Sequence, residues 1–213
     1  MKVPAPSLAP ILRSDTQGRI LARILADVTR SYSLSELVAW ARSSMPTVQR
    51  EVERAEQAGI VTTEKVGPTR LVRANPQHRL HGALSQLILA TYGPPAVVAA
   101  EFEGIDDAAS VVLFGSWAAR YLGEQGRAPN DIDVLVIGSP DRDAVDDAAE
   151  RAEHVIGLPV QATVRSRAQW TAADDTFIRE VKSRPIVVVL VDEDDHEIHE
   201  ELRRLDARIG GRA

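Results

Sequence analysis

Apolar positions near the start of the chain follow a helical period. Between residues 16 and 29 they recur at the spacing of one helix face, at Ile20, Leu21, Ile24, Leu25 and Val28. A second helix is predicted to start at Ser33, because Ser33 and Glu36 have the spacing of a capping box. The pattern therefore predicts two short amphipathic helices in succession.

A third helix, predicted over residues 45–58 with Gly59 as its C-cap, has two different faces. One face is apolar, and we expect it to pack on the first two helices. The other carries a hydroxyl, an amide and two guanidinium groups, which suit the bases and phosphates of a DNA major groove. These are the side chains of Thr47, Gln49, Arg50 and Arg54.

Two short strands around a turn are predicted directly after this helix, over residues 60–66 and 71–73. This hairpin adds Lys65 and Arg70, whose positive charges suit DNA phosphates. Another helix is then predicted up to about Tyr92, where Gly93-Pro94-Pro95 ends it. It connects the two halves of the chain, and packing against a second subunit in a homodimer is one alternative for its apolar face.

The second half begins with an apolar run, Ser110 to Phe114, that is typical of a buried strand. Gly115-Ser116 follows at once, and a helix is predicted from Trp117. A glycine turn between a strand and a helix N-terminus suits a phosphate, because the backbone approaches closely and free amides face the anion. Later segments predict strands over 159–164 and 186–191, a helix after Asp174-Asp175, and a charged helix over 192–209.

Two carboxylates open the next apolar run. Asp131 and Asp133 are two residues apart, so in an extended strand they point to the same face. Adjacent carboxylates repel each other unless a cation lies between them, and Mg²⁺ prefers oxygen ligands from carboxylates and substrate phosphates. The pair indicates a magnesium–nucleotide site. The alternative is a solvated loop end whose two acids only cap the strand.

These two motifs, Gly115-Ser116 and Asp131-Ile132-Asp133, resemble the signature of the DNA polymerase β-like nucleotidyltransferase superfamily, most of all its small MNT-type members. The resemblance implies that Gly115 and Ser116 hold the triphosphate of ATP or another NTP. It implies that Asp131 and Asp133 bind Mg²⁺ and serve catalysis. Arg120 lies between the motifs and is a further candidate for nucleotide binding.

The chain departs from that family pattern on a later strand. The family usually has a third carboxylate there, and Gln161 fills its expected place. A neutral amide is a poor general base. Nucleotide binding is therefore better supported than turnover.

The stretch from Met45 to Val61 resembles the recognition helices of ArsR and MarR-like winged-helix regulators. The resemblance covers residues 15–75 and implies DNA as a partner, although many winged helices only bind protein. The predicted class is α+β: an N-terminal winged helix-turn-helix, and a C-terminal nucleotidyltransferase fold with a small mixed sheet flanked by helices. The predicted domains are residues 1–75, a connecting helix over 76–94, and residues 95–213.

Charge and composition adjust this interpretation only slightly. Residues 1–100 hold 12 Lys and Arg against 7 Asp and Glu, whereas residues 101–213 hold 13 against 24. If nucleic acid binds, we expect the basic first half to hold it. The absence of cysteine fits a reducing cytoplasm, and we expect no secretory signal and no apolar run that approaches a membrane span.

Three functions compete on this pattern. The first is a nucleotidyltransferase that binds Mg–NTP and transfers a nucleoside monophosphate to an acceptor hydroxyl. The second is a transcriptional regulator whose nucleotidyltransferase domain is degenerate and senses a nucleotide or supports a dimer. The third, a module that only binds proteins, leaves the carboxylate pair unexplained.

Overall fold

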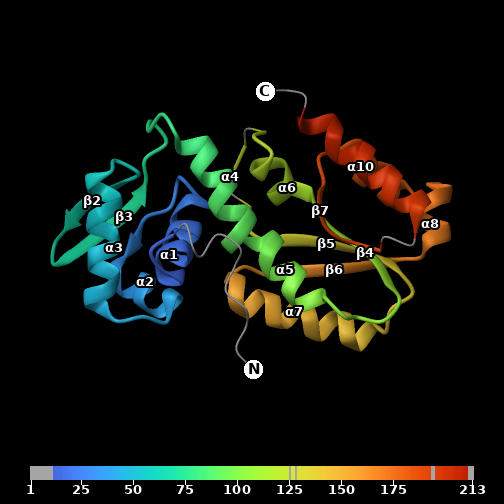
Figure 1. The fold of residues 1–213 in the computed structure, drawn as a ribbon, viewed down its shortest axis with the longest axis horizontal. Helices are drawn as coiled ribbons and strands as arrows, with labels where there is room; N and C mark the ends of the chain where they lie inside the picture. Colours follow the sequence, from blue (N-terminus) through green and yellow to red (C-terminus); the bar gives the residue numbers. More distant parts are fainter. Residues whose placement is uncertain (1–11, 125, 128, 193–194, 211–213) are drawn as a thin grey trace. The chain divides into compact units, whose positions relative to one another are not determined.

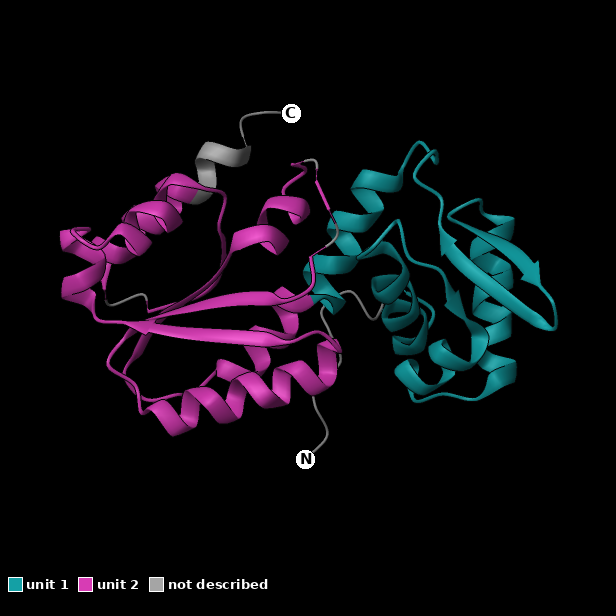
Figure 2. Ribbon diagram, turned by 180° about the vertical axis from the view of Figure 1, so that it is seen from behind, with its two compact units in different colours: residues 1–93 teal, residues 94–213 magenta. Residues whose placement is uncertain are grey.

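The computed structural model describes residues 12–124, 126–127, 129–192 and 195–210, without the side chains of 206–210. The chain divides into two compact units, Met1–Gly93 and Pro94–Ala213, which Figure 2 colours separately. Each unit has its own helices and its own sheet, and each is described by itself below.

The first unit combines helices with a small antiparallel sheet (Figure 1). The sheet has the order β1-β3-β2. Its strand β1 has two residues and was not predicted, whereas the hairpin β2–β3 was. The elements in chain order are α1 (Asp15–Leu25), β1 (Tyr32–Ser33), α2 (Leu34–Ala41), α3 (Met45–Gln57), β2 (Val61–Val66), β3 (Thr69–Ala74) and α4 (His81–Tyr92).

Local capping fixes the start of α2 as predicted. The Ser33 hydroxyl accepts a hydrogen bond from the Glu36 amide at 3.2 Å, and the Glu36 carboxylate accepts one from the Ser33 amide at 2.7 Å. Two boundary predictions were wrong. Helix α1 ends at Leu25, which leaves Val28 outside it and 39% exposed. The C-cap of α3 is Ala58, and Gly59 follows it with a φ of +74°.

Helix α4 packs on α1, and one of their contacts is especially close. A side chain added at Gly18 would place its Cβ atom 2.3 Å from the ring of Tyr92. The phenol ring therefore lies directly on the glycine, and this contact requires the absence of a side chain at position 18. Helix α4 is thereby part of the core of the first unit.

The prediction that no apolar run approaches a membrane span needs correction. Helix α4 and the next helix form a stretch, His81–Phe102, of 22 residues and mean hydropathy 1.3, which is long and apolar enough to cross a membrane. Helices in protein cores reach the same length and composition. Ile88, Val98 and Phe102 in this stretch are buried, but only 28% of its most apolar 18-residue window is buried within the protein.

The second unit is a four-stranded mixed sheet with helices on both faces (Figure 1). The strand order is β6-β5-β4-β7. Strands β5 and β6 are parallel, and the other pairs are antiparallel. The elements are α5 (Pro94–Phe102), β4 (Ala108–Phe114), α6 (Gly115–Tyr121), β5 (Ile132–Gly138), α7 (Arg142–Ile156), β6 (Val160–Arg165), α8 (Arg167–Ala172), α9 (Thr176–Ser183), β7 (Val187–Val191) and α10 (His196–Gly210).

Two hydrophobic clusters hold the helices on this sheet. Side chains of α5, α6 and α7 pack on one face, where Ile132, Val134 and Val136 of β5 point. Side chains of α8, α9 and α10 pack on the other face, where Leu135 and Ile137 point. Alternation along β5 thus separates the two cores, and Asp133 falls on the face of Leu135.

The predicted α+β class is confirmed, with a three-stranded antiparallel sheet near the N-terminus and a four-stranded mixed sheet with helices. The predicted strands of the second half are present as β4 to β7, and Asp175 caps α9 by accepting from the Phe177 amide at 2.9 Å. Helices α5, α7 and α8 were not predicted. Gly93-Pro94-Pro95 ends one helix, but Pro94 also begins the next.

Candidate functional site

The turn between β4 and α6 depends on glycine for two reasons. Gly115 has a φ of +71°, a backbone conformation that side chains with a Cβ rarely adopt. A Cβ atom built at Gly115 would also lie 2.1 Å from Oδ2 of Asp133. Ser116 is exposed in the first turn of the helix that follows. The sequence motif therefore forms a close-approach turn whose neighbour is a carboxylate.

Strand pairing brings the acidic motif to this turn. Phe114, the last residue of β4, is the antiparallel partner of Asp133 on β5. Asp131 directly precedes β5, two residues before Asp133 and so on the same face by alternation. Two segments that are separate in sequence thus meet at one end of the two central strands. They contain the four predicted residues Gly115, Ser116, Asp131 and Asp133.

The two carboxylates form an anionic pair. Partial burial, and secondarily the negative charge of Asp131, raise the pKa of Asp133 above its ordinary value. Neither acid forms a salt bridge with a lysine or arginine in the part of the chain that the structure describes. The repulsion within the pair is therefore uncompensated by protein charges in those residues, and a bound cation would relieve it.

Gln161 occupies the side of β5 opposite to the glycine turn. It lies on β6, where the parallel register pairs it with Asp133, and its Nε2 donates a hydrogen bond to Oδ2 of Asp131 at 3.0 Å. Among the described residues no group of three or more His, Cys, Asp and Glu side chains could hold a metal. The oxygen ligands available to a metal are thus those of two carboxylates and one neutral amide, which fit Mg²⁺ by chemical type.

Arg120, predicted to bind the nucleotide, contacts the loop after its own helix. Its Nη1 donates to the carbonyl oxygen of Glu124. A Cβ atom at Gly126 would lie 2.7 Å from the Arg120 guanidinium carbon, so this glycine makes room for the arginine. In this conformation Arg120 contacts Glu124 and Gly126, which follow the end of α6.

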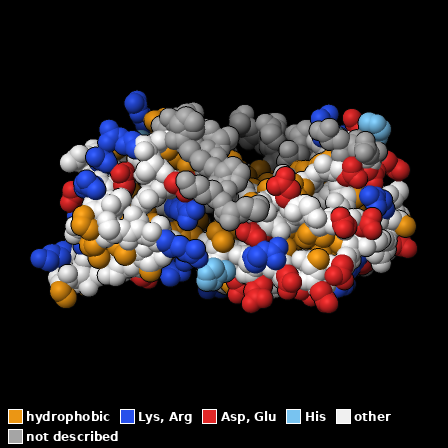
Figure 3. Space-filling model, turned by 60° about the horizontal axis from the view of Figure 1, so that its bottom comes forward, with side chains coloured by type: hydrophobic (Ala, Val, Ile, Leu, Met, Phe, Trp, Pro, Cys, Tyr) orange, Lys and Arg blue, Asp and Glu red, His pale blue; other side chains and the backbone are white. Residues whose placement is uncertain are grey.

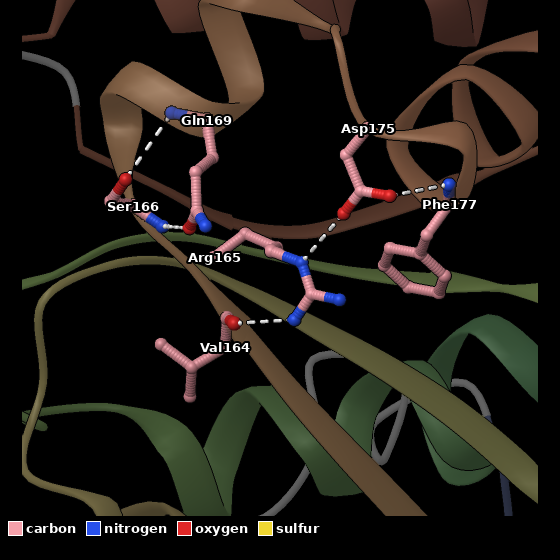
Figure 4. Close-up of polar contacts among 6 residues, drawn as sticks. All are labelled: Val164, Arg165, Ser166, Gln169, Asp175 and Phe177. Atoms are coloured by element: carbon pink, nitrogen blue, oxygen red, sulfur yellow. Dashed lines mark hydrogen bonds and ion pairs between the residues drawn. The ribbon is translucent and has the colours of Figure 1, made fainter.

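An aromatic and charged cluster at the far end of β6 was missed by the sequence analysis (Figure 4). The Arg165 guanidinium lies 4.7 Å from the ring centroid of Phe177, and its Nε donates to Asp175 at 3.3 Å. Phe177 in turn meets Phe114 edge to face at a centroid distance of 5.5 Å. Because Phe114 directly precedes Gly115, this cluster ties α9 and β6 to the strand that carries the turn.

The exposed face of α3 carries the predicted DNA-binding residues. Val48, Val52 and Ala55 are buried as predicted, which turns the opposite side of the helix outward. On that side Gln49, Arg50 and Arg54 are exposed, and Thr47 is partly exposed. Arg54 is engaged within the helix, because its Nη1 donates to the buried carboxylate of Glu51 at 2.8 Å.

Acidic side chains of α3 bind the β2–β3 hairpin and offset part of the hairpin's positive charge. Arg70 of β3 donates to Glu56 at 2.5 Å and lies 3.8 Å from Glu53. Glu56 also accepts from the hydroxyl of Thr63 on β2. Of the cations predicted to bind DNA, Arg50 and Lys65 form no salt bridge with other described residues, so their charges remain available to a polyanion.

Surface charge differs between the units (Figure 3). Lys and Arg side chains gather on the visible face of the first unit, whereas acidic side chains dominate that of the second. Part of this acidic surface is the outer side of α7, formed by the exposed residues Asp143, Asp146, Asp147 and Glu150. A negatively charged partner is therefore better suited to the first unit.

In comparisons with known proteins, no protein-family model and no curated protein matches the chain.

Proposed function

We propose that the second unit is a nucleotidyltransferase-type domain that binds a magnesium-bound nucleoside triphosphate. The observation that carries the proposal is the contact between Asp133 and Gly115, because it joins a phosphate-type turn to an uncompensated carboxylate pair. The order of strand, Gly-Ser turn, helix and Asp-x-Asp strand also agrees with the DNA polymerase β-like pattern.

Each residue has a defined task in this proposal. The backbone of Gly115 and the hydroxyl of Ser116 hold the phosphates at the start of α6. Asp131 and Asp133 supply carboxylate oxygens to Mg²⁺, which when bound neutralises charge on the phosphates. Strand β5 is itself almost fully buried, and its pairing with β4 and β6 keeps the carboxylates in position before any ligand arrives.

Transfer of a nucleoside monophosphate is a second candidate activity, and the carboxylate pair is the observation that favours it. Gln161 argues for retention of the nucleotide, because an amide does not accept a proton from an attacking hydroxyl at neutral pH. The geometry thus favours a nucleotide-binding domain over an efficient transferase.

We further propose that the first unit is a winged helix that binds DNA, with α3 in the major groove and the β2–β3 hairpin as the wing. The exposed polar face of α3 and the chain order of three helices and a hairpin support this assignment. Binding of the unit to a protein is the alternative, and the acids that engage Arg54 and Arg70 favour it. The combined function is that of a cytoplasmic, nucleotide-responsive regulator.

Equilibrium dialysis of labelled ATP with the full chain tests the first proposal. We expect ATP to bind with Mg²⁺, to dissociate in excess EDTA, and to bind far more weakly to the variant Asp131→Asn with Asp133→Asn. The matched control is Asp143→Asn with Asp146→Asn, which removes the same charge from the exposed side of α7 and should bind like the wild type. Equal binding by both variants would refute the site.

Incubation of the chain with ATP labelled at the α-phosphate, Mg²⁺ and cell extract tests the transfer reaction separately. Label on a macromolecule or small acceptor that disappears in the double Asp variant would establish transfer. Bound but untransferred nucleotide would establish the sensing function instead.

A further inference from the structure

The two neighbours of β5 present different chemistry to the carboxylate pair. Strand β4 leads into the glycine turn, which offers backbone and a hydroxyl group. Strand β6 presents Gln161, whose Nε2 already donates to Oδ2 of Asp131 at 3.0 Å. The side chain of Gln161 is exposed, so the strand register and this hydrogen bond hold it in position. On the side of β4 the carboxylates therefore face a turn suited to phosphates. On the side of β6 they face the hydrogen-bond donor of Gln161.

Charge limits how many cations such a site accepts. Two carboxylates carry two negative charges, which one divalent cation balances. A second cation in a two-metal site lies about 3.5–4 Å from the first, where the repulsion between them is large unless further anions surround both. Nucleotide phosphates supply anions on the side of Gly115. On the side of β6 a second cation meets an amide and an oxygen of Asp131 that is already hydrogen-bonded.

We propose that Gln161 restricts this site to a single divalent cation, held on the side of the glycine turn, and thereby keeps the nucleotide bound without transfer. The inference rests on the proposed function, because it presupposes a metal–nucleotide site at Asp131 and Asp133. Gln161 is a positioning residue in this account: it orients one carboxylate and withholds the anion that a second cation requires.

The number of Mn²⁺ ions bound per chain tests this directly. Mn²⁺ replaces Mg²⁺ as an electron paramagnetic resonance probe, and the nucleotide is an ATP analogue with a methylene group between the α- and β-phosphorus atoms, which blocks transfer. We expect one bound ion for the wild type and two for Gln161→Glu, which exchanges the amide for a carboxylate of equal size. Gln161→Ala should still bind one ion, because it removes the donor without adding charge.

Gln169→Glu is the matched control, because it adds the same charge in the same unit while its side-chain oxygen still accepts from the Ser166 amide. It should bind one ion. Two ions in the wild type, or one ion in Gln161→Glu, would overturn the inference while leaving the nucleotide site intact. No bound Mn²⁺ in the wild type would overturn the proposed function and this inference together.

Stability provides a second readout for the same variant. In EDTA the Gln161→Glu variant places a third carboxylate beside two others, so we expect its melting temperature to fall below that of the wild type and Mn²⁺ to restore it. Equal melting temperatures for Gln161→Glu and the wild type in EDTA would contradict the repulsion between residue 161 and the pair.

Discussion

The carboxylate of Asp133 fills the space that a side chain at Gly115 would need, with Oδ2 2.1 Å from the position of a Cβ atom there. Replacement of this glycine therefore has two costs: an unfavourable backbone conformation, and displacement of a carboxylate from the proposed magnesium site. The first cost is common to other glycines of the second unit, and the second is specific to this one.

Gly115→Ala should unfold at a lower denaturant concentration than the wild type and should lose magnesium-dependent ATP binding. Gly104→Ala is the control, because Gly104 has a φ of +80° and no atom within 4 Å of its Cβ position. The control should lose only the backbone contribution, about 1–2 kcal/mol of the free energy of unfolding, and bind ATP normally. Normal ATP binding by Gly115→Ala would contradict the proposed turn.

Asp133→Asn should stabilise the metal-free chain. Burial and the charge of Asp131 raise the pKa of Asp133 in the folded state, so the folded chain takes up this proton more readily than the unfolded chain. Stability from this group is present below the unfolded pKa of about 3.9 and is lost as pH rises through the folded pKa. At neutral pH in EDTA, we expect a melting temperature higher by roughly 1–3 °C.

The same comparison with Mg²⁺ and ATP should reverse the order, because only the wild type gains stability from the ligand. Thermal unfolding in EDTA and in Mg–ATP measures both effects on the same samples. A variant that is less stable than the wild type in EDTA would show that Asp133 stabilises the fold and does not serve a ligand.

Arg50→Ala should weaken DNA binding by roughly 5- to 150-fold, the range that corresponds to loss of about 1–3 kcal/mol from one arginine contact. Lys65→Ala should weaken binding to all sequences and reduce the salt dependence by about one ion. Fluorescence anisotropy at several salt concentrations measures both.

Arg70→Ala should have the smaller effect on affinity, because Glu56 and Glu53 already engage Arg70. Its loss should instead lower the stability of the hairpin against α3. An equal loss of affinity in the Arg50 and Arg70 variants would mean that DNA phosphates displace those acids.

Two serines should respond in opposite ways to alanine. Ser110 is 1% exposed, and its hydroxyl has no hydrogen-bond partner among the described residues, so Ser110→Ala should be neutral or stabilise the chain by about 1 kcal/mol. Ser33→Ala removes the capping box of α2 and should cost about 1 kcal/mol. Urea unfolding compares the two, and a large loss at Ser110 would show that its hydroxyl is satisfied.

Features encoded over a few residues could be predicted from the sequence. The capping box at Ser33, the cap at Asp175 and the alternation along β5 depend on neighbours within four residues. Helix α7 was missed although it is 15 residues long, because alanines such as Ala148 and Ala152 form much of its buried face and give a weak apolar signal. Strand β1 has only two residues, which is too short to show a period.

The candidate site could be predicted only in its parts. The motifs placed Gly115, Asp131 and Asp133, but the contact between them depends on the register of β4 against β5. Position 161 was expected to face the site, yet its hydrogen bond to Asp131 depends on the parallel register of β6. The salt bridges of Arg54 and Arg70 depend on rotamers and on hairpin packing, which side-chain type alone does not determine.

The central claim is that Asp131, Asp133 and the Gly115-Ser116 turn hold one metal–nucleotide complex. A crystal structure of the full chain with Mn²⁺ and the methylene analogue of ATP tests it most directly, because Mn²⁺ is located by its anomalous scattering. The account predicts one anomalous peak between the carboxylates of Asp131 and Asp133, with phosphate oxygens against the Gly115-Ser116 turn. Nucleotide bound elsewhere, or carboxylates without a metal at saturating Mn²⁺, would contradict it.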